Sequence, residues 1–264
     1  NEEWKYTYYN KILQQGFEVT TTTSNCCVPS SVTEVERQAV IDAVKTAQAR
    51  QVYIVEESMA AAIGAGLPIE DASGSMIIDL GGGTTDIAVF SLGDIVVGKT
   101  MKTAGDEMDQ DIVNYIRSKY NMLIGERTAE DMKIMMGSAT PLKKEKKYPV
   151  QGRDLLTGLP KTIELSSIEV REAIMNTISL ITEVIKDAIE ETPPELLKDL
   201  VSSGVYIAGG GALITGLDTY WTEELELPVK IVEDPLSAAA RGTSLMLDHI
   251  DLLDRVQKSW EELV

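Results

Sequence analysis

Short apolar runs and longer amphipathic stretches alternate along most of this chain. The short runs are rich in Val and Ile, a composition that favours buried strands. They predict strands at 26–28, 52–55, 75–80, 84–90, 94–101, 205–207 and 229–232. The two strands at 84–90 and 94–101 are separated by Leu92-Gly93-Asp94, so we expect a tight connection there.

The longer stretches carry apolar residues at helical spacing. Two of them begin with a capping-box pattern, at 33–36 and at 166–169. In the first helix, Val35 and every fourth residue after it, through Ala47, are expected on the buried face. The second helix is long and should end before Pro193. Further helices are predicted at 59–66, 106–120, 128–136 and 236–247, with a helical face also at Tyr6, Tyr8, Tyr9, Ile12 and Leu13.

This alternation predicts an α/β fold, in which ligands bind at the carboxyl ends of strands. A polar, lysine-rich stretch at 137–165 interrupts the alternation and is expected to be a small β-rich insertion. The chemistry should therefore be sought where predicted strands end, and not within the insertion.

The charge balance narrows the choice of ligand. The chain carries 24 Lys and Arg against 42 Asp and Glu, which gives a net charge of −18. Such an acidic surface repels nucleic-acid backbones, so neither DNA nor RNA is an expected partner. A nucleotide is still compatible, because backbone N–H groups and a bound Mg²⁺ can hold phosphates without Lys or Arg.

The cysteines and the hydropathy indicate the cellular compartment. Cys26 and Cys27 are adjacent, so they close no useful disulfide loop, and a reducing cytoplasm is favoured. No apolar run is long enough to span a bilayer. The first ten residues lack the apolar core of a signal peptide.

The most specific local feature is the segment 79–86, Asp-Leu-Gly-Gly-Gly-Thr-Thr-Asp, which starts at the end of one predicted strand and runs into the next. Gly81, Gly82 and Gly83 carry no Cβ atoms, so the backbone N–H groups of this turn can close on a phosphate. Asp79 would repel that phosphate unless a cation lay between them, which predicts Mg²⁺. The alternative is a tight glycine hairpin without a ligand.

Two further strand ends carry suggestive residues. The triplet 209–211, Gly-Gly-Gly, could let the backbone pack against a base or an α-phosphate, or could be an ordinary strand-to-helix turn. Glu56 and Glu57 end a strand before a helix of small residues. A carboxylate there could orient an attacking water, or could simply be favoured by the helix macrodipole. Two glycine turns in one chain suggest two halves that clamp one ligand.

Together these segments resemble the superfamily of actin, sugar kinases and heat-shock-chaperone ATPases, and within it the MreB family of bacterial actin homologues. The resemblance runs from about residue 28 to residue 264. The stretches that carry it are VPSSVTEVERQAV (28–40), EESMAAAIGAGLP (56–68), DLGGGTTDIAV (79–89), AGDEMD (104–109), IGERTAEDMK (124–133), DLLTGLP (154–160) and AGGGALITGLD (208–218). In this order they are highly specific for the family.

The resemblance implies an actin-like ATPase fold of two ribonuclease-H-like lobes, of which the first is incomplete. The remainder of lobe I would be 1–72, mainly subdomain IA with a fragment near IB, and the chain would return to subdomain IA at 234–264. Subdomain IIA would comprise 73–104 and 175–233, and subdomain IIB would comprise 105–174.

The same resemblance implies bound ATP and Mg²⁺ and assigns roles to residues. Glu57 and Thr84 would orient the hydrolytic water, and Asp79 would hold the Mg²⁺ shell. The nucleotide itself would contact Gly81, Gly82, Gly83 and Thr84 at the phosphates, Gly209, Gly210 and Gly211 at the adenosine, and Glu130 and Lys133 at the ribose and adenine. Such a site would act mainly through positioning and electrostatics, as phosphoryl transfer requires.

For function, the resemblance implies a slow ATPase coupled to polymerisation. The subunits would form head-to-tail filaments that determine rod shape and organise cell-wall synthesis with the cell-shape machinery at the inner membrane face. The location would be cytoplasmic and, in the complete protein, membrane-associated. The family's first phosphate loop, most of subdomain IB and its membrane-anchoring N-terminal segment find no match in this sequence, so hydrolysis is expected to be impaired.

Two other functions exist on the same fold. A chaperone-like ATPase would move a substrate domain and would not polymerise, and a sugar kinase would need sugar-binding residues in the first lobe. Neither the substrate domain nor those residues are matched here, so the filament-forming ATPase is the preferred prediction.

Overall fold

The computed structural model describes residues 23–248 and residue 253. The predicted helical face at Tyr6, Tyr8, Tyr9, Ile12 and Leu13 lies outside the described residues. The centre of the fold is a five-stranded sheet in the order β10-β9-β3-β4-β5, in which β10, β9 and β3 are parallel and β4 and β5 are antiparallel to their neighbours. Its strands are β3 (Ser75–Leu80), β4 (Thr85–Ser91), β5 (Asp94–Met101), β9 (Val205–Ala208) and β10 (Val229–Ile231).

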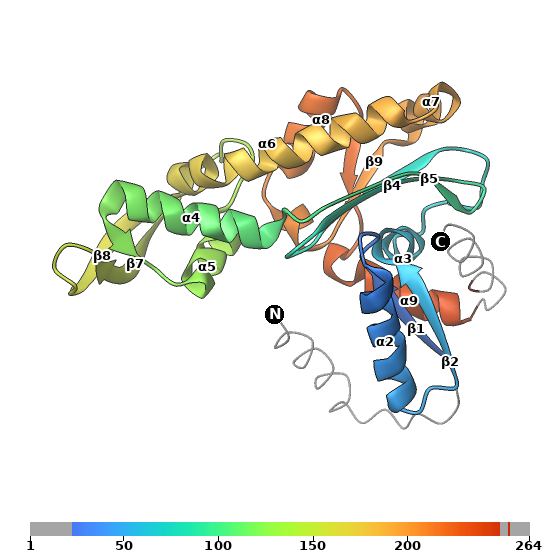
Figure 1. Cartoon of the computed structure of the whole chain (residues 1–264). Helices are drawn as coiled ribbons and strands as arrows, with labels where there is room; N and C mark the ends of the chain where they lie inside the picture. Colours follow the sequence, from blue (N-terminus) through green and yellow to red (C-terminus); the bar gives the residue numbers. More distant parts are fainter. Residues whose placement is uncertain (1–22, 249–252, 254–264) are drawn as a thin grey trace.

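Both faces of this sheet are buried. On β3, Met76, Ile78 and Leu80 join one hydrophobic cluster, whereas Ile77 between them joins another. The first cluster includes side chains of α6 (Ser167–Glu191), α7 (Pro194–Ser203) and α8 (Leu217–Leu225), and the second includes α3 (Glu57–Gly64) and α9 (Ala238–Leu247). Helices therefore cover the sheet on both sides (Figure 1), which confirms the predicted α/β fold.

An outer part, residues 105–166, extends away from the five-stranded sheet along α6 (Figure 1). It holds α4 (Gly105–Tyr120), α5 (Glu126–Met136) and a three-stranded antiparallel sheet of β6 (Met122–Leu123), β7 (Lys147–Asp154) and β8 (Pro160–Ser166). The predicted β-rich insertion is confirmed by β7 and β8. The outer part shares the first cluster with α6 and the central sheet, so one continuous core links them.

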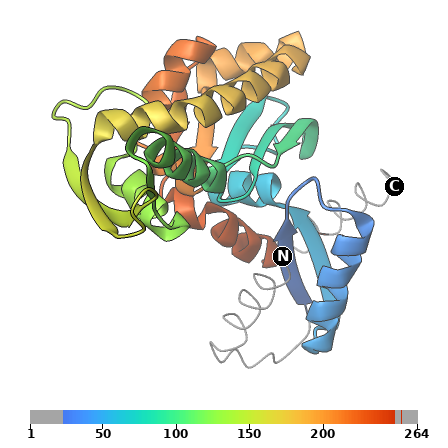
Figure 2. The same cartoon turned by 60° about the vertical axis from the view of Figure 1, so that its left-hand side comes forward.

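A smaller unit packs at the opposite end of the molecule, where β1 (Thr23–Val28) and β2 (Gln51–Glu56) form a parallel pair beside α2 (Glu34–Thr46) (Figure 2). The predicted capping box is present: the Thr33 hydroxyl accepts from the Glu36 N–H, and the Thr33 N–H donates to the Glu36 carboxylate. The cap fixes where the helix begins.

The predicted buried face of α2 is wrong. Val35 is 80% exposed, and the side chains that pack against the β1–β2 pair are those of Val40, Ile41 and Val44. The expected face consisted of one valine followed by alanines, whereas the true face carries three branched side chains. The larger apolar area gains more from burial, so it sets the rotation of the helix.

The second capping box, Ser166 with Glu169, opens α6 as predicted. The short helices α7 and α8 were not predicted. Pro193-Pro194 was interpreted only as a stop, but proline suits the first turn of a helix, and α7 begins at Pro194. The strand predicted at 229–232 was expected to be a core strand. Only Val229 of β10 is buried, and Ile231 is 40% exposed, because β10 lies at the edge of the sheet.

Helices α3 and α9 cross at unusually close range. A Cβ on Gly64 would lie 1.8 Å from the Ala238 carbonyl oxygen, and one on Gly242 would lie 1.7 Å from the Ala60 carbonyl oxygen. Only glycine fits at either position. Across the described part of the chain, no helix combines the length and the apolar character needed to cross a membrane.

Candidate functional site

The two glycine turns meet at one edge of the central sheet. Strands β3 and β9 are parallel neighbours, and Asp79 lies opposite Ala208 in their register. The turns 81–83 and 209–211 follow these two strands directly. Both therefore leave the sheet at the same carboxyl edge, where open α/β sheets bind their ligands.

The first turn is a hairpin between β3 and β4, closed by the Gly81 N–H donating to the Thr84 carbonyl at 3.0 Å. Its carbonyls are also in use. The N–H groups of Gly105 and Asp106, which begin α4, donate to the carbonyls of Gly81 and Gly82 at 3.2 and 2.8 Å. The glycine-hairpin alternative thus describes the local geometry correctly, but the hairpin also abuts a cavity.

The second turn fits against the first only because it is made of glycine. Gly209 has a φ of +81°, and a Cβ there would lie 2.3 Å from the Leu80 carbonyl oxygen. A Cβ on Gly211 would lie 2.2 Å from the Leu80 side chain, whereas Gly210 faces the Leu236 side chain. Gly211 therefore serves the packing of the turn against β3.

A cavity of about 200 Å³ lies between these turns and the start of α3; we call it the cleft. Its lining is drawn from four parts of the chain that are far apart in sequence. The lining residues are Glu57, Asp79, Gly81, Thr84, Asp86, Gly209, Gly210, Pro235, Leu236 and Ala239.

Most of the predicted site residues are in this lining, but five are elsewhere. Gly82 and Gly83 are exposed at the tip of the first turn, where the carboxylate of Asp106 is the nearest neighbouring group. Gly211 packs on Leu80. Glu130 is exposed on α5, and Lys133 is engaged with Asp109 and Gly105.

Sequence reasoning missed some lining residues. Asp86 could have been found, because it and Asp79 flank the hairpin turn and pair across the strands. Pro235, Leu236 and Ala239 carried no signal, because tertiary contacts bring them to the cleft: the Gly209 N–H donates to the Pro235 carbonyl at 2.9 Å, and α9, which holds Ala239, packs on α3.

The cleft concentrates negative charge. Burial raises the pKa of Asp79 to about 7, and the charges of Glu57 and Asp86 add to the effect. Burial, and then the charge of Asp86, likewise raises the pKa of Glu57 to about 7. Among the described residues, the charges that act on these two groups are all carboxylates. Like charges held together out of water favour a cation between them.

At two further carboxyls, Asp86 and Glu56, hydrogen bonds partly offset the effect of burial on the pKa. Burial raises the pKa of Asp86 even though its Oδ1 accepts from the Thr100 hydroxyl at 2.6 Å and from the Ser30 N–H at 3.4 Å. Burial also raises the pKa of Glu56, which lies beside the cleft and accepts from the Ser30 hydroxyl. Ser30 therefore connects the segment between β1 and α2 to Asp86 in the lining of the cleft and to Glu56 beside it.

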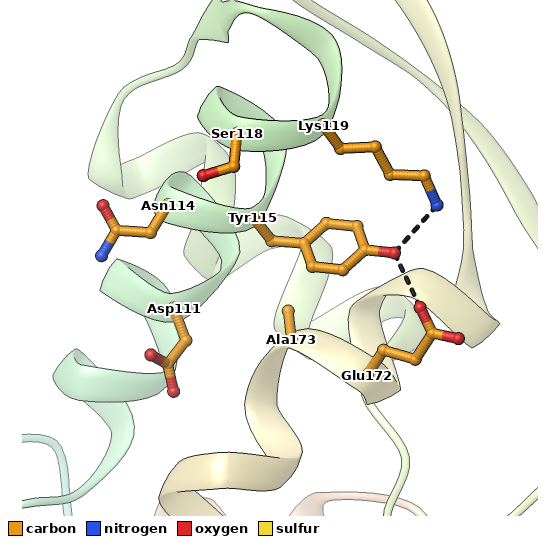
Figure 3. Close-up of a pocket in the computed structure, with 7 residues that line it drawn as sticks. All are labelled: Asp111, Asn114, Tyr115, Ser118, Lys119, Glu172 and Ala173. Carbon is orange, nitrogen blue, oxygen red and sulfur yellow. Dashed lines mark hydrogen bonds between the residues drawn. The ribbon is translucent and has the colours of Figure 1, made fainter.

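A larger hollow, of about 470 Å³, lies between α4 and α6; we call it the α4–α6 groove (Figure 3). Several of its polar groups satisfy one another. The Tyr115 hydroxyl donates to Glu172 at 2.7 Å, and Lys119 donates to the Tyr115 oxygen at 2.9 Å (Figure 3). The groove is open to solvent and lies away from the strand ends, so size alone does not mark the functional site.

A central sheet covered by helices on both faces, with two glycine turns and clustered carboxylates at its carboxyl edge, places the chain in the actin-like fold class. The family described as MreB/Mbl protein matches residues 7–255. The chain belongs to the MreB/Mbl family, as the sequence motifs predicted.

Relatives at substantial identity support this assignment. The cell shape-determining protein Mbl of Bacillus subtilis (strain 168) is 46% identical over 229 residues, which cover 87% of this chain and 69% of Mbl. The cell shape-determining protein MreB of Escherichia coli (strain K12) is 44% identical over 226 residues, covering 86% of this chain and 65% of that protein.

Solved structures confirm the actin-like fold. MreB5 of Spiroplasma citri bound to ADP superposes with a TM-score of 0.90 at 41% identity, covering 95% of this chain and 76% of MreB5. The same protein bound to AMPPNP gives a TM-score of 0.86 at 40% identity, covering 97% and 77%. A MamK double helical filament, at 20% identity, has a TM-score of 0.77 and covers 90% and 73%. This last likeness concerns the fold alone.

Proposed function

We propose that this chain binds ATP with Mg²⁺ in the cleft and acts as a filament-forming, cell-shape-determining ATPase. The observation that carries the proposal is the convergence of two glycine turns and three carboxylates, one buried and two half-buried, on one cavity at the carboxyl edge of the sheet. Structures of the related MreB5 with ADP and with AMPPNP support a nucleotide as the ligand.

The phosphates belong at the first turn. Gly81, Gly82 and Gly83 offer backbone without side chains, and Thr84 adds a hydroxyl at the edge of the cavity. Gly209 and Gly210 form the opposite wall, where bare backbone can lie against the adenosine. Gly211 contributes by letting that wall approach β3.

The donor set fits a magnesium ion. Asp79 is half-buried beside two other carboxylates; burial raises its pKa, and a cation would relieve the repulsion from Glu57 and Asp86 that adds to the effect. Among the described residues no three acidic, histidine or cysteine side chains are grouped so as to hold a metal by themselves. Asp79 would therefore hold the ion together with water and phosphate oxygens, which is the usual arrangement for Mg²⁺. The bound ion would offset charge on the phosphates.

Glu57 and Thr84 both line the cavity and would orient the attacking water. Glu57 is suited to this task because a carboxyl with its pKa raised to about 7 can accept a proton near neutral pH. Its place at the first turn of α3, directly after β2, brings the side chain to the lining of the cleft. Glu130 on α5 would reach the ribose and adenine.

For the cell, we propose head-to-tail self-assembly in the cytoplasm, at the inner membrane face, together with the cell-wall synthesis and cell-shape machinery. The names of Mbl and MreB as cell shape-determining proteins support this role. Ordered head-to-tail stacking of identical subunits gives open filaments, because each subunit meets the next through two different faces.

Two measurements test the proposal. Calorimetric titration should show ATP binding that Mg²⁺ strengthens, and sedimentation should show ATP-dependent pelleting. Binding without pelleting at any protein concentration would favour a chaperone-like ATPase. Phosphate transfer to a sugar would favour a kinase of the same fold, and absence of ATP binding would reject the proposed site.

A further inference from the structure

A nearly buried ion pair connects α5 to α4 close to the first glycine turn. Lys133 Nζ donates to Asp109 Oδ2 at 2.8 Å and to the Gly105 carbonyl oxygen at 2.7 Å. The two side chains are only 14% and 10% exposed. The ammonium group of Lys133 thus bridges a carboxylate one turn into α4 and the first carbonyl of the same helix.

Gly105 is the point at which three elements meet. Its carbonyl accepts from Lys133, and its N–H donates to the carbonyl of Gly81. A Cβ on Gly105 would lie 3.2 Å from both the Gly81 carbonyl oxygen and Lys133 Nζ, so the packing there leaves little slack. The next amide, that of Asp106, holds the carbonyl of Gly82. Hydrogen bonds therefore connect the Lys133 head group to the glycine turn by way of the first residues of α4.

The pair is poorly arranged for stability alone. Asp109 Oδ1 is buried and has no hydrogen-bond partner among the described residues. Burial raises the pKa of Asp109 although Lys133 opposes that shift. Removing both charges from water is expensive unless every lone pair is satisfied, and a buried oxygen without a partner calls for another explanation.

We propose that Asp109 is a positioning residue: it holds Lys133 on the Gly105 carbonyl and so fixes the first glycine turn in the shape that receives the terminal phosphates. The inference rests on the proposed nucleotide function. It gives Lys133 a different task from the ribose and adenine contact that the family resemblance implies. A turn whose N–H groups are preorganised loses less entropy when a phosphate binds, so the benefit falls on phosphates and not on the base.

The test compares binding of ATP and of adenosine, because only ATP carries the phosphates that the turn would hold. Calorimetric titrations with Mg²⁺ would use the wild-type chain, Asp109→Asn, Lys133→Met and the double variant. Asp111→Asn is the matched control. It lies on the same helix two residues further on, and its Oδ2 accepts from Thr177 of α6 at 2.6 Å, on the side of the α4–α6 groove (Figure 3).

We expect Asp109→Asn to weaken ATP binding about tenfold, as loss of one good interaction does, while adenosine binding changes less than about twofold. Lys133→Met should do the same, and the double variant should be no worse than either single variant, because both act through one contact. Asp111→Asn should leave both affinities as in the wild type. Urea denaturation of each variant in the same buffer confirms that folded protein is compared.

Other outcomes overturn the idea. Equal losses of ATP and adenosine affinity in Lys133→Met would return Lys133 to the ribose and adenine. Additive losses in the double variant, or an unchanged ATP preference in Asp109→Asn, would remove Asp109 from phosphate binding. Should Asp109→Asn fail to fold, Lys133→Gln, which leaves Asp109 intact, carries the same comparison. Absence of ATP binding by the wild-type chain would instead refute the proposed function, and this inference with it.

Discussion

Carboxylates in two regions of this molecule differ in opposite directions from their ordinary behaviour. In the cleft, burial raises the pKa of Asp79 and of Glu57 to about 7. Asp154 in the outer part and Glu169 at the adjoining start of α6 each have a pKa lowered to about 2. The amino-acid types are the same, so the difference lies in what surrounds them.

The outer carboxylates are satisfied by their own chain. Asp154 accepts from the backbone N–H of Thr157, from Lys161 and from the N–H of Leu156. For Glu169, burial acts to raise the pKa, but hydrogen bonds from Ser166, Tyr120 and Lys119 together outweigh it. Such groups stabilise the fold and need no ligand.

The cleft carboxylates repel one another, and a bound cation would relieve that repulsion. A site of this kind gives up folding stability to keep charge in place for a ligand. This contrast separates acids that hold the structure together from acids that serve function. It can be tested by changing one member of each group at a time.

The largest effect is expected for Glu57→Gln. The change keeps the shape of the side chain and removes the base, so in a chain extended to the full length of its MreB relatives ATP hydrolysis should fall about 100-fold while ATP affinity stays within about twofold. Steady-state phosphate release and calorimetry measure the two quantities. Glu56→Gln is the control, because Glu56 is bound by Ser30 beside the cleft and does not line it. A comparable fall in the control would mean that α3, and not Glu57, had been disturbed.

Asp79→Asn should come next. Mg²⁺ should lose most of its effect on ATP affinity, a change of about tenfold, which corresponds to ~1.4 kcal/mol. The nucleotide-free protein should not lose stability, because one of three crowded negative charges has been removed. Binding titrations with and without Mg²⁺, together with thermal melts, provide the readouts. A large fall in melting temperature without nucleotide would place Asp79 among the structural acids.

Glu169→Gln should act on stability only. It removes the negative charge that caps α6 and that accepts hydrogen bonds from Tyr120 and Lys119. We expect the free energy of unfolding to fall by about 1 kcal/mol near neutral pH, while ATP binding is unchanged. The pKa is lowered in the folded state from 4.5 to about 2, so this stabilisation is fully present above pH 4.5 and is lost as the pH falls toward 2. Urea denaturation at pH 7 and at pH 3 should show the variant approaching the wild type in acid. A difference that widened at pH 3 would contradict the assignment.

The smallest effect is expected for Glu164→Gln. Glu164 pairs with Lys147 at 2.6 Å between β8 and β7, but both side chains are mostly exposed. Exposed ion pairs contribute little, because water and salt screen them. The melting temperature and the ATP affinity should both match those of the wild type. A clear loss of stability would show that the hairpin depends on this pair.

Much of the fold follows from local signals. Both capping boxes, the hairpin between β4 and β5 and the strands before the glycine turns could be predicted, because each depends on residues close in sequence. The rotation of α2 could not, since it depends on which side chains fill the space beside β1 and β2. The start of α7 at Pro194 could not be predicted, because proline is common both after the end of a helix and in the first turn of one.

The residues of the candidate site also fall into those that local sequence predicts and those that it does not. Asp79, Thr84 and Gly209 were recognisable at strand ends, and the parallel pairing of β3 with β9 brings them together. The pairing of Lys133 with Asp109 was not predictable from spacing, because it depends on how α5 packs against α4. Relative placement of helices is decided by the whole core, and no short motif encodes it.

The crossing of α3 and α9 restricts how this chain can change over generations. The atoms that a Cβ on Gly64 or Gly242 would strike first are carbonyl oxygens of the other helix, and every amino acid has one. A replacement at either glycine therefore cannot be repaired by exchanging a side chain on the other helix. Because α3 begins at Glu57 and α9 brings Ala239 to the cleft, the close contact of the two helices holds two walls of the cleft in one arrangement. Homologous chains should be free to vary the surfaces of both helices while these two positions stay fixed.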